Sequence, residues 1–291
     1  MNGRRWLLAL ALLGWVPLAA ATGGNAAGSS GSLTLNTSLS VDAADDHDYQ
    51  LGGQVGVSDS TFLNFLSEYT SSPASSTDLV THTDSLGVEQ ALGRHAGFGL
   101  RYESWGKSND LVSDAFYGSV YWQTRDWQLT ASPGTRRITL YTRSGKIANL
   151  LNLPNSIDIR DNPLGLRVDY SGVENWLFEV STTRHHYSRD PSVLGRRIAL
   201  LFFTGSALTL SQGFLSHSST ARVERDFDLT SLAMDYEIDR SALDGTYSYT
   251  TDIDFTTPVS NSFDIEITTG VTHSVKFPET GFITFNLVYY H

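Results

Sequence analysis

Apolar and polar residues alternate with a period of two from residue 33 to the end of the chain. Residues 232–239, for example, read LAMDYEID, which places Leu, Met, Tyr and Ile on one side and Ala, Asp, Glu and Asp on the other. Successive side chains of a β-strand point to opposite faces, so one face of each segment is apolar and the other carries charge. The alternation therefore predicts an all-β protein whose strands separate two different media.

Two architectures could use such strands. In a soluble β-sandwich the apolar face would form the core and the charged face would contact water. In a transmembrane β-barrel the apolar face would contact lipid and the charged face would line a polar lumen, and the sheet must close because each strand has to pair on both sides. The two ends of the chain favour a transmembrane, antiparallel, up-and-down β-barrel.

Residues 1–21, MNGRRWLLALALLGWVPLAAA, combine a positive start, an apolar stretch and small residues at the expected cleavage site. This pattern predicts a secretory signal peptide, with a twin-arginine signal as an alternative. Residues 22–32 are a flexible Gly/Ser/Ala lead-in, and residues 33–291 are the expected barrel. The absence of cysteine excludes a lipoprotein anchor, disulfides and thiol catalysis.

The charge balance excludes one class of partner. The formal net charge is −11, and removal of Arg4 and Arg5 with the signal peptide would make it more negative by two. An acidic chain of this kind lacks the basic footprint that nucleic-acid binding needs, so no nucleic acid is expected as a partner.

The alternating segments predict about fourteen strands, with twelve or sixteen as alternatives. The expected strands are 33–42, 48–57, 61–70, 82–92, 96–105, 114–124, 127–135, 163–172, 175–187, 213–225, 229–239, 245–258, 262–273 and 281–291. Residues 136–142 are expected to extend the seventh strand, with Pro133 at a bulge. The stretch 190–213 is open to interpretation as a loop with a short helix or as a further strand.

The connections alternate in length, as the periplasmic and extracellular ends of such barrels do. The short links are 58–60, 93–95, 125–126, 172–175, 226–228 and 259–261, and the long ones are 42–48, 71–81, 106–113, 143–163, 188–212, 240–244 and 274–280. Aromatic residues near strand ends suit girdles at the membrane interfaces. They are Tyr69, Trp105, Trp122, Trp127, Trp176, Tyr187, Phe255, Phe282 and Tyr290.

The last strand, GFITFNLVYYH, carries the most specific resemblance. The chain resembles Gram-negative outer-membrane β-barrel proteins and is similar in size to monomeric fourteen-stranded porins. In that class the final strand is an assembly signal of alternating aromatics that ends in Phe or Trp. The resemblance assigns this membrane-assembly role to Phe285, Leu287, Tyr289 and the terminal His291, and it implies the barrel-assembly machinery and outer-membrane lipid as partners.

The face opposite the apolar one is expected to line the lumen. The residues assigned to it are Asp235, Glu237, Asp239, Asp252, Asp254, Asp264, Glu266, Arg101, Glu103, Arg167, Asp169, Arg222 and Glu224, with Glu68, Glu89 and Glu179 on the same face. Buried charge without partners is costly, so this acidic wall must be wet or paired. A wet acidic wall favours cations. The alternative is that the three arginines bridge to these acids and close the barrel.

Three loops carry further hypotheses. The acidic loop 42–48 could bind a divalent cation or be simply solvated. The basic loop 184–190, with Arg196 and Arg197, could contact lipopolysaccharide phosphates through bidentate arginine contacts or be solvated. Loop 143–163, with Leu150, Leu151 and Leu153, could fold into the mouth and narrow it, and it would gate the channel together with loop 188–212.

The pattern as a whole indicates a passive, porin-like channel for small polar solutes or cations, with no cofactor and no metal. Two alternatives are a non-conducting structural or surface-interaction barrel, which would bind lipopolysaccharide or a partner, and a polymer-export conduit with Tyr117 and Tyr121 in its lumen. An enzyme is not expected. His185, His186 and His217 are the candidate bases of a hydrolase, but no nucleophile elbow, HExxH, P-loop or GxGxxG pattern occurs.

Overall fold

The computed structural model describes residues 31–43, 46–72, 79–107, 111–141, 156–192, 214–275 and 279–291, and β-strands dominate them. The strands are β1 (Leu33–Asp42), β2 (His47–Ser58), β3 (Thr61–Ser72), β4 (Leu79–Ala91), β5 (Ala96–Lys107), β6 (Leu111–Gln123), β7 (Trp127–Tyr141), β8 (Ser156–Asp161), β9 (Leu164–Tyr170), β10 (Trp176–Arg184), β11 (Leu215–Phe227), β12 (Thr230–Ser241), β13 (Tyr247–Ser260), β14 (Phe263–Ser274) and β15 (Thr280–Tyr290). The described residues include no helix with the length and hydropathy needed to span a bilayer.

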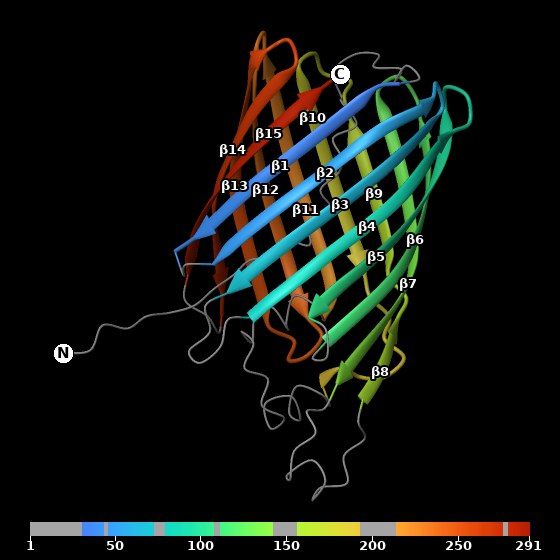
Figure 1. Ribbon diagram of the computed structural model, residues 1–291, viewed down its shortest axis with the longest axis vertical. Helices are drawn as coiled ribbons and strands as arrows, with labels where there is room; N and C mark the ends of the chain where they lie inside the picture. Colours follow the sequence, from blue (N-terminus) through green and yellow to red (C-terminus); the bar gives the residue numbers. More distant parts are fainter. Residues whose placement is uncertain are drawn as a thin grey trace, which may run out of the picture.

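The sheet closes on itself (Figure 1). All pairings are antiparallel, and the first strand meets the last, with Thr34 opposite Tyr290 and Asp42 opposite Phe282. Leu33 and His291 exchange backbone hydrogen bonds of 3.0 and 2.8 Å across this seam. Closure pairs both edges of every barrel strand, as a sheet in lipid requires. The prediction of a closed, up-and-down, antiparallel barrel is confirmed.

Strands β8 and β9 are two parts of one barrel strand. Both pair with β7 in a single continuous register, with Arg136 opposite Asp161 in β8 and Pro133 opposite Leu164 in β9. The barrel therefore has fourteen strands, as predicted. The expected start of this strand at residue 163 is wrong. Residues 156–161, expected to belong to loop 143–163, are the first part of the strand. Pro163 has no amide hydrogen, so it interrupts the hydrogen-bond ladder between the two parts.

Two further details of the strands differ from expectation. No bulge occurs at Pro133, because the register between β6 and β7 is the same on both sides of it, with Tyr117 opposite Gly134 and Val120 opposite Ala131. Strand β10 ends at Arg184, earlier than the expected residue 187. The chain leaves the ladder there and Tyr187 forms an isolated bridge with Asp161.

The two ends of the barrel differ in the length of their connections. The links between β2 and β3, β4 and β5, β6 and β7, β9 and β10, β11 and β12, and β13 and β14 are short, and the C-terminus lies at the same end (Figure 1). The longer connections lie at the opposite end, called the loop end below, where β8 and the tip of β7 extend beyond their neighbours (Figure 1). Residues 193–213, with Arg196 and Arg197, and residues 142–155, with Leu150, Leu151 and Leu153, lie outside the described part.

The outer surface is an apolar belt. Large apolar side chains at alternate positions are exposed, among them Leu86, Leu100, Phe116, Val120, Leu129, Leu166, Val180, Met234, Ile253 and Phe285. Their sequence neighbours point to the other face and are polar or small, for example Arg101, Glu179 and Asp252. Soluble monomers rarely expose apolar patches of this extent, whereas the hydrocarbon of a bilayer matches them.

The aromatic residues divide between the two faces. Tyr69, Trp122, Trp127 and Phe255 are exposed on the outer face near strand ends, as expected for girdles. The same expectation is wrong for Trp105, Phe282, Tyr290 and Tyr187. The first three follow the inner-face alternation of their strands, and Trp105 and Phe282 are buried, whereas Tyr187 packs inside the loop end.

Candidate functional site

The inner face of the barrel carries the charged residues. All thirteen residues predicted from the alternation occupy inner-face positions, and so do Glu68, Glu89 and Glu179. The cross-strand register fixes this arrangement, because Arg222 lies opposite Asp235, Asp235 opposite Asp252, and Glu266 opposite Asn286. Side chains directly opposite on adjacent strands lie close enough to interact. The register therefore assembles charges that are far apart in sequence into contiguous clusters.

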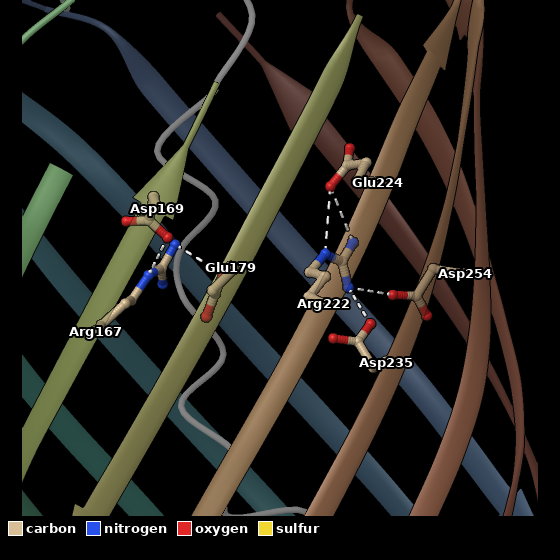
Figure 2. Close-up of polar contacts among 7 residues, drawn as sticks. All are labelled: Arg167, Asp169, Glu179, Arg222, Glu224, Asp235 and Asp254. Carbon is tan, nitrogen blue, oxygen red and sulfur yellow. Dashed lines mark hydrogen bonds and ion pairs between the residues drawn. The ribbon is translucent and has the colours of Figure 1, made fainter. Parts of the chain in front are cut away.

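The largest cluster surrounds Arg222 of β11 (Figure 2). Its Nη1 donates to Asp235 Oδ2 of β12 and, at 2.6 Å, to Asp254 Oδ2 of β13. Its Nη2 lies 3.2 Å from Glu224 Oε2 on its own strand. Thr268 of β14 donates to the second oxygen of Asp254 at 2.6 Å. One guanidinium thus serves three carboxylates, so the cluster keeps a net negative charge.

A smaller cluster surrounds Arg167 of β9 (Figure 2). Its Nε donates to Asp169 Oδ1 at 2.8 Å, and its Nη2 lies 3.0 Å from Glu179 Oε2 of β10. Further round the wall, Arg101 of β5 lies 3.3 Å from Glu103 and stacks 4.8 Å above the ring of Tyr117 on β6. These contacts match the alternative in which the arginines bridge to neighbouring acids, but only where an arginine is present, on β5, β9 and β11.

Besides the clusters around Arg222, Arg167 and Arg101, a fourth cluster lies at the loop end, and it was not predicted from the sequence. Asp161 is fully buried, and its Oδ2 lies 3.1 Å from Arg136 Nη2 and 2.6 Å from His185 Nδ1. Its Oδ1 accepts the backbone N–H of His186 at 3.1 Å. Arg136 also donates to the hydroxyl of Tyr187 at 3.2 Å. The signal was present in the alternation of SIDIRD, residues 156–161, but those residues were assigned to a loop.

The inner wall is divided into two sectors. The arginines come from β5, β7, β9 and β11. Within the described residues, the inner positions of β12–β15 and β1–β4, called the acidic sector below, carry no Lys or Arg. Carboxylates of the acidic sector also take hydroxyl and amide partners: Asp48 and Glu68 share the hydroxyl of Thr70, Glu237 accepts from Ser218 of β11, and Glu266 accepts from Asn286. Such partners do not neutralise charge, so these carboxylates stay ionised only where water or mobile cations reach them.

Three carboxylates, Asp235, Asp252 and Asp254, present oxygens within 4.8 Å of one another, a spacing that could suit a metal ion. Arg222 already contacts two of them, so the chain supplies its own cation there. In the acidic loop 42–48, Asp42 accepts the backbone N–H of Asp46 at 3.0 Å, and Asp45 lies outside the described residues. We assign no metal to either place.

On β5–β8 the inner face becomes apolar at the loop end. Trp105 of β5, Leu111 of β6, Ile138 and Leu140 of β7, Ile159 of β8 and Phe214 form a buried cluster, and Ile157, Tyr187, Ala242 and Leu243 pack against it. The cluster joins β5–β8 to the start of β11 and to the β12–β13 loop. We call it the apolar collar. Its buried side chains occupy the inner face on that side, whereas Leu150, Leu151 and Leu153 of the expected narrowing loop 143–163 lie outside the described part.

The candidate hydrolase residues do not assemble a triad among the described residues. His185 pairs with Asp161 inside the fourth cluster. His217 Nε2 lies 2.8 Å from Ser219 Oγ on the same strand, but its cross-strand neighbours, Arg184 and Arg240, offer no acceptor that would orient the imidazole. A Ser–His pair without an orienting partner is a weak hydrolase signature.

Closure, strand number, turn asymmetry and the apolar belt together decide the class. This is the architecture of an outer-membrane β-barrel. No protein-family model matches the chain, and no curated protein does.

Several solved structures are similar in shape. The KdgM porin shares 6% identity over 88% of this chain and 98% of its own, with a TM-score of 0.42. A loop L8 deletion mutant of OmpT, an outer membrane protein of Vibrio cholerae, shares 10% identity over 89% and 98%, with a TM-score of 0.46. The outer membrane protein OpdK of Pseudomonas aeruginosa shares 9% identity over 89% and 98%, with a TM-score of 0.43. These similarities assign neither a solute nor a functional residue to this chain.

Proposed function

We propose that the protein is a passive, porin-like channel of the Gram-negative outer membrane that passes small polar solutes and prefers cations. The observation that carries this proposal is the acidic sector of the inner wall, in which carboxylates such as Glu237 and Glu266 have hydroxyl and amide partners but no arginine. A carboxylate without a cationic partner stays ionised only in contact with water or counter-ions. Water in the interior and a negative field are the two requirements of a cation-preferring pore.

The proposed location follows from the outer surface and the two ends of the chain. The apolar belt suits lipid, residues 1–21 would export the chain, and the short turns would face the periplasm. We propose that the final strand, with Phe285, Leu287, Tyr289 and His291, is read by the barrel-assembly machinery. Phe285 and Leu287 are exposed on the outer face, where a partner could reach them.

The test is the conductance of the refolded protein in a planar bilayer under a KCl gradient. The expected result is discrete openings with a reversal potential of the sign for cation preference. The variant Glu237→Gln plus Asp252→Asn should reduce that potential, because it removes two inner carboxylates that form no salt bridge with an arginine in the described structure. The matched control, Asp84→Asn plus Asp114→Asn, removes the same charge from the outer face and should leave the potential unchanged.

A barrel that folds but never conducts would reject the channel and favour the structural or surface-interaction alternative. One observation supports that alternative, namely the apolar collar, whose buried side chains occupy the inner face of β5–β8 at the loop end. The polymer conduit has less support. Tyr117 is covered by Arg101, and the ring of Tyr121 lies over Gly97, where a Cβ would clash with it. Both rings are therefore occupied in wall packing.

A further inference from the structure

Three basic or ionisable side chains form a row on the outer face of the barrel at the loop end. Arg184 of β10 lies opposite His217 of β11, which lies opposite Arg240 of β12. Arg184 and Arg240 are exposed. Because adjacent strands are separated by about 4.8 Å, the two arginine Cα atoms lie about 10 Å apart across the sheet. Arg240 also stacks 5.6 Å above the ring of Tyr247, the next residue in the row.

This row lies where the apolar belt ends. Toward the short-turn end of the same strands, the outer face presents Val180 on β10 and Met234 and Tyr236 on β12, all of them exposed. In the other direction the strands pass into the connections of the loop end. Arginine and tyrosine at such a boundary lie at the depth of lipid headgroups.

The row differs in the sign of its charge from the outer rim on β3–β6, where Asp84 and Asp114 are acids. On β3–β8 the outer rim carries Asp84, bound by Ser67, Asp114, bound by Tyr102, and Asp158 paired with Arg137 at 2.7 Å. Within the described structure, neither Arg184 nor Arg240 forms a salt bridge. Two acids lie near: Asp190 accepts the N–H of Ser192 at 2.9 Å, and Asp244 accepts the N–H of Thr246 at 3.0 Å.

A hollow adjoins the row. It has a volume of about 480 Å³ and is open to the outside. Its lining includes Arg189 and Arg240, with Tyr187, Asp190, Ser216 and Ser241 also present. The Ser216 hydroxyl donates to the carbonyl of Arg240 at 3.0 Å and Ser241 Oγ accepts the N–H of Leu243, so the arginine forks are the groups that would hold phosphate oxygens. A hollow of this size admits a sugar headgroup.

We propose that Arg184, His217, Arg240 and the adjoining hollow bind a phosphorylated sugar headgroup of the outer leaflet, the anionic part of lipopolysaccharide. Arg240 belongs to both the row and the hollow, so it would contact the phosphate, while Arg184 and Arg189 would bind from either side. Basic side chains at headgroup depth attract anionic lipid. The proposal requires the loop end to face the outer leaflet, as the proposed location has it, but it does not require the barrel to conduct.

The experiment measures binding of bisphosphorylated lipid A to the purified mature protein in detergent micelles, with dephosphorylated lipid A as the comparison ligand. The test variant is Arg184→Gln plus Arg240→Gln. The control variant, Arg125→Gln plus Arg225→Gln, removes the same charge from the outer surface at the short-turn end, where Arg225 stacks on Trp176. Folding of each variant is checked by heat-modifiable gel mobility.

We expect the test variant to bind bisphosphorylated lipid A about 10- to 30-fold more weakly than the wild type, and the control variant to bind unchanged. Wild-type protein should bind dephosphorylated lipid A only as weakly as the test variant binds the intact lipid. Equal binding of the two lipids, or equal losses in the two variants, would overturn the site. Displacement by millimolar inorganic phosphate would also overturn it and assign the row to a free anion.

A second variant tests the site if the first variant does not fold. Arg184→Lys plus Arg240→Lys keeps the charge but loses the bidentate fork, so an intermediate loss of affinity is expected. Unchanged affinity in this variant and in a folded Arg240→Gln single variant would reject the site. Because the site lies outside the barrel, its variants should conduct like the wild type. If the protein binds lipid A through this row but does not conduct, the proposed channel is rejected and the lipid site stands.

Discussion

Asp161 is the most deeply buried charge described in the molecule, with no exposed surface and three partners: Arg136 on β7, and His185 and His186 after β10. We predict that Asp161→Asn lowers the free energy of unfolding by about 3 kcal/mol, because it leaves the buried guanidinium of Arg136 without its carboxylate. The control is Asp158→Asn, three residues earlier on β8. Its partner Arg137 is exposed, so the loss should stay below about 1 kcal/mol. Urea unfolding of the refolded barrels, followed by tryptophan fluorescence, measures both.

Equal losses for the two variants would mean that the Asp161 contacts add nothing to an ordinary rim salt bridge. The fourth cluster would then be a consequence of the packing in the apolar collar. A large loss at Asp161 alone would instead show that the cluster holds the tip of β7 and β8 against the segment 185–187. That segment is where the chain leaves β10 for the long loop-end connection.

At the scale of the element, Gly270 of β14 explains why an aromatic residue lies on the inner face. Gly270 lies opposite both Asp252 and Phe282, and a Cβ at this position would meet Asp252 Cβ at 2.6 Å and the ring of Phe282. The ring covers the glycine, so Gly270→Ala should lower the free energy of unfolding by about 1–3 kcal/mol through overpacking. Gly118→Ala is the control, because its nearest neighbours are 4.0 Å away. The same urea experiment decides, and equal stability of the two variants would contradict the packing role of Phe282.

The contact between Phe282 and Gly270 shows what the sequence can and cannot predict about the strands. Alternation alone was enough to assign the strands and to place Asp235, Arg222 and their partners on the inner face, because a period of two is a local property. It also places Phe282 and Trp105 on the inner face, against the girdle expectation, but it could not reveal how a ring is accommodated there, since that depends on a glycine or an apolar neighbour in another strand. The strand assignment also failed at β8 although the alternation was present, because Pro163 interrupts hydrogen bonding in a strand whose register with β7 is nevertheless continuous.

At the scale of the whole molecule, the inner wall is electrically asymmetric. Four arginines on β5, β7, β9 and β11 lie among acids, whereas β12–β15 and β1–β4 present acids without inner-face arginines in the described residues. Where an arginine bridges its neighbours, the local field is reduced. The field that a diffusing ion meets therefore comes mainly from the acidic sector, and it acts across water rather than through a tight binding site.

A diffuse field of this kind has a recognisable dependence on salt. The Debye length is about 10 Å at 0.1 M salt and about 3 Å at 1 M, so a carboxylate wall attracts cations across the interior only at low salt. We therefore predict that the ratio of K⁺ to Cl⁻ permeability, obtained from reversal potentials in planar bilayers, falls steeply between 0.1 and 1 M KCl. In the Glu237→Gln plus Asp252→Asn variant the ratio should already be low at 0.1 M. A ratio that does not change with salt would place selectivity in direct contacts at a narrow point, for which the apolar collar at the loop end is the first place to look.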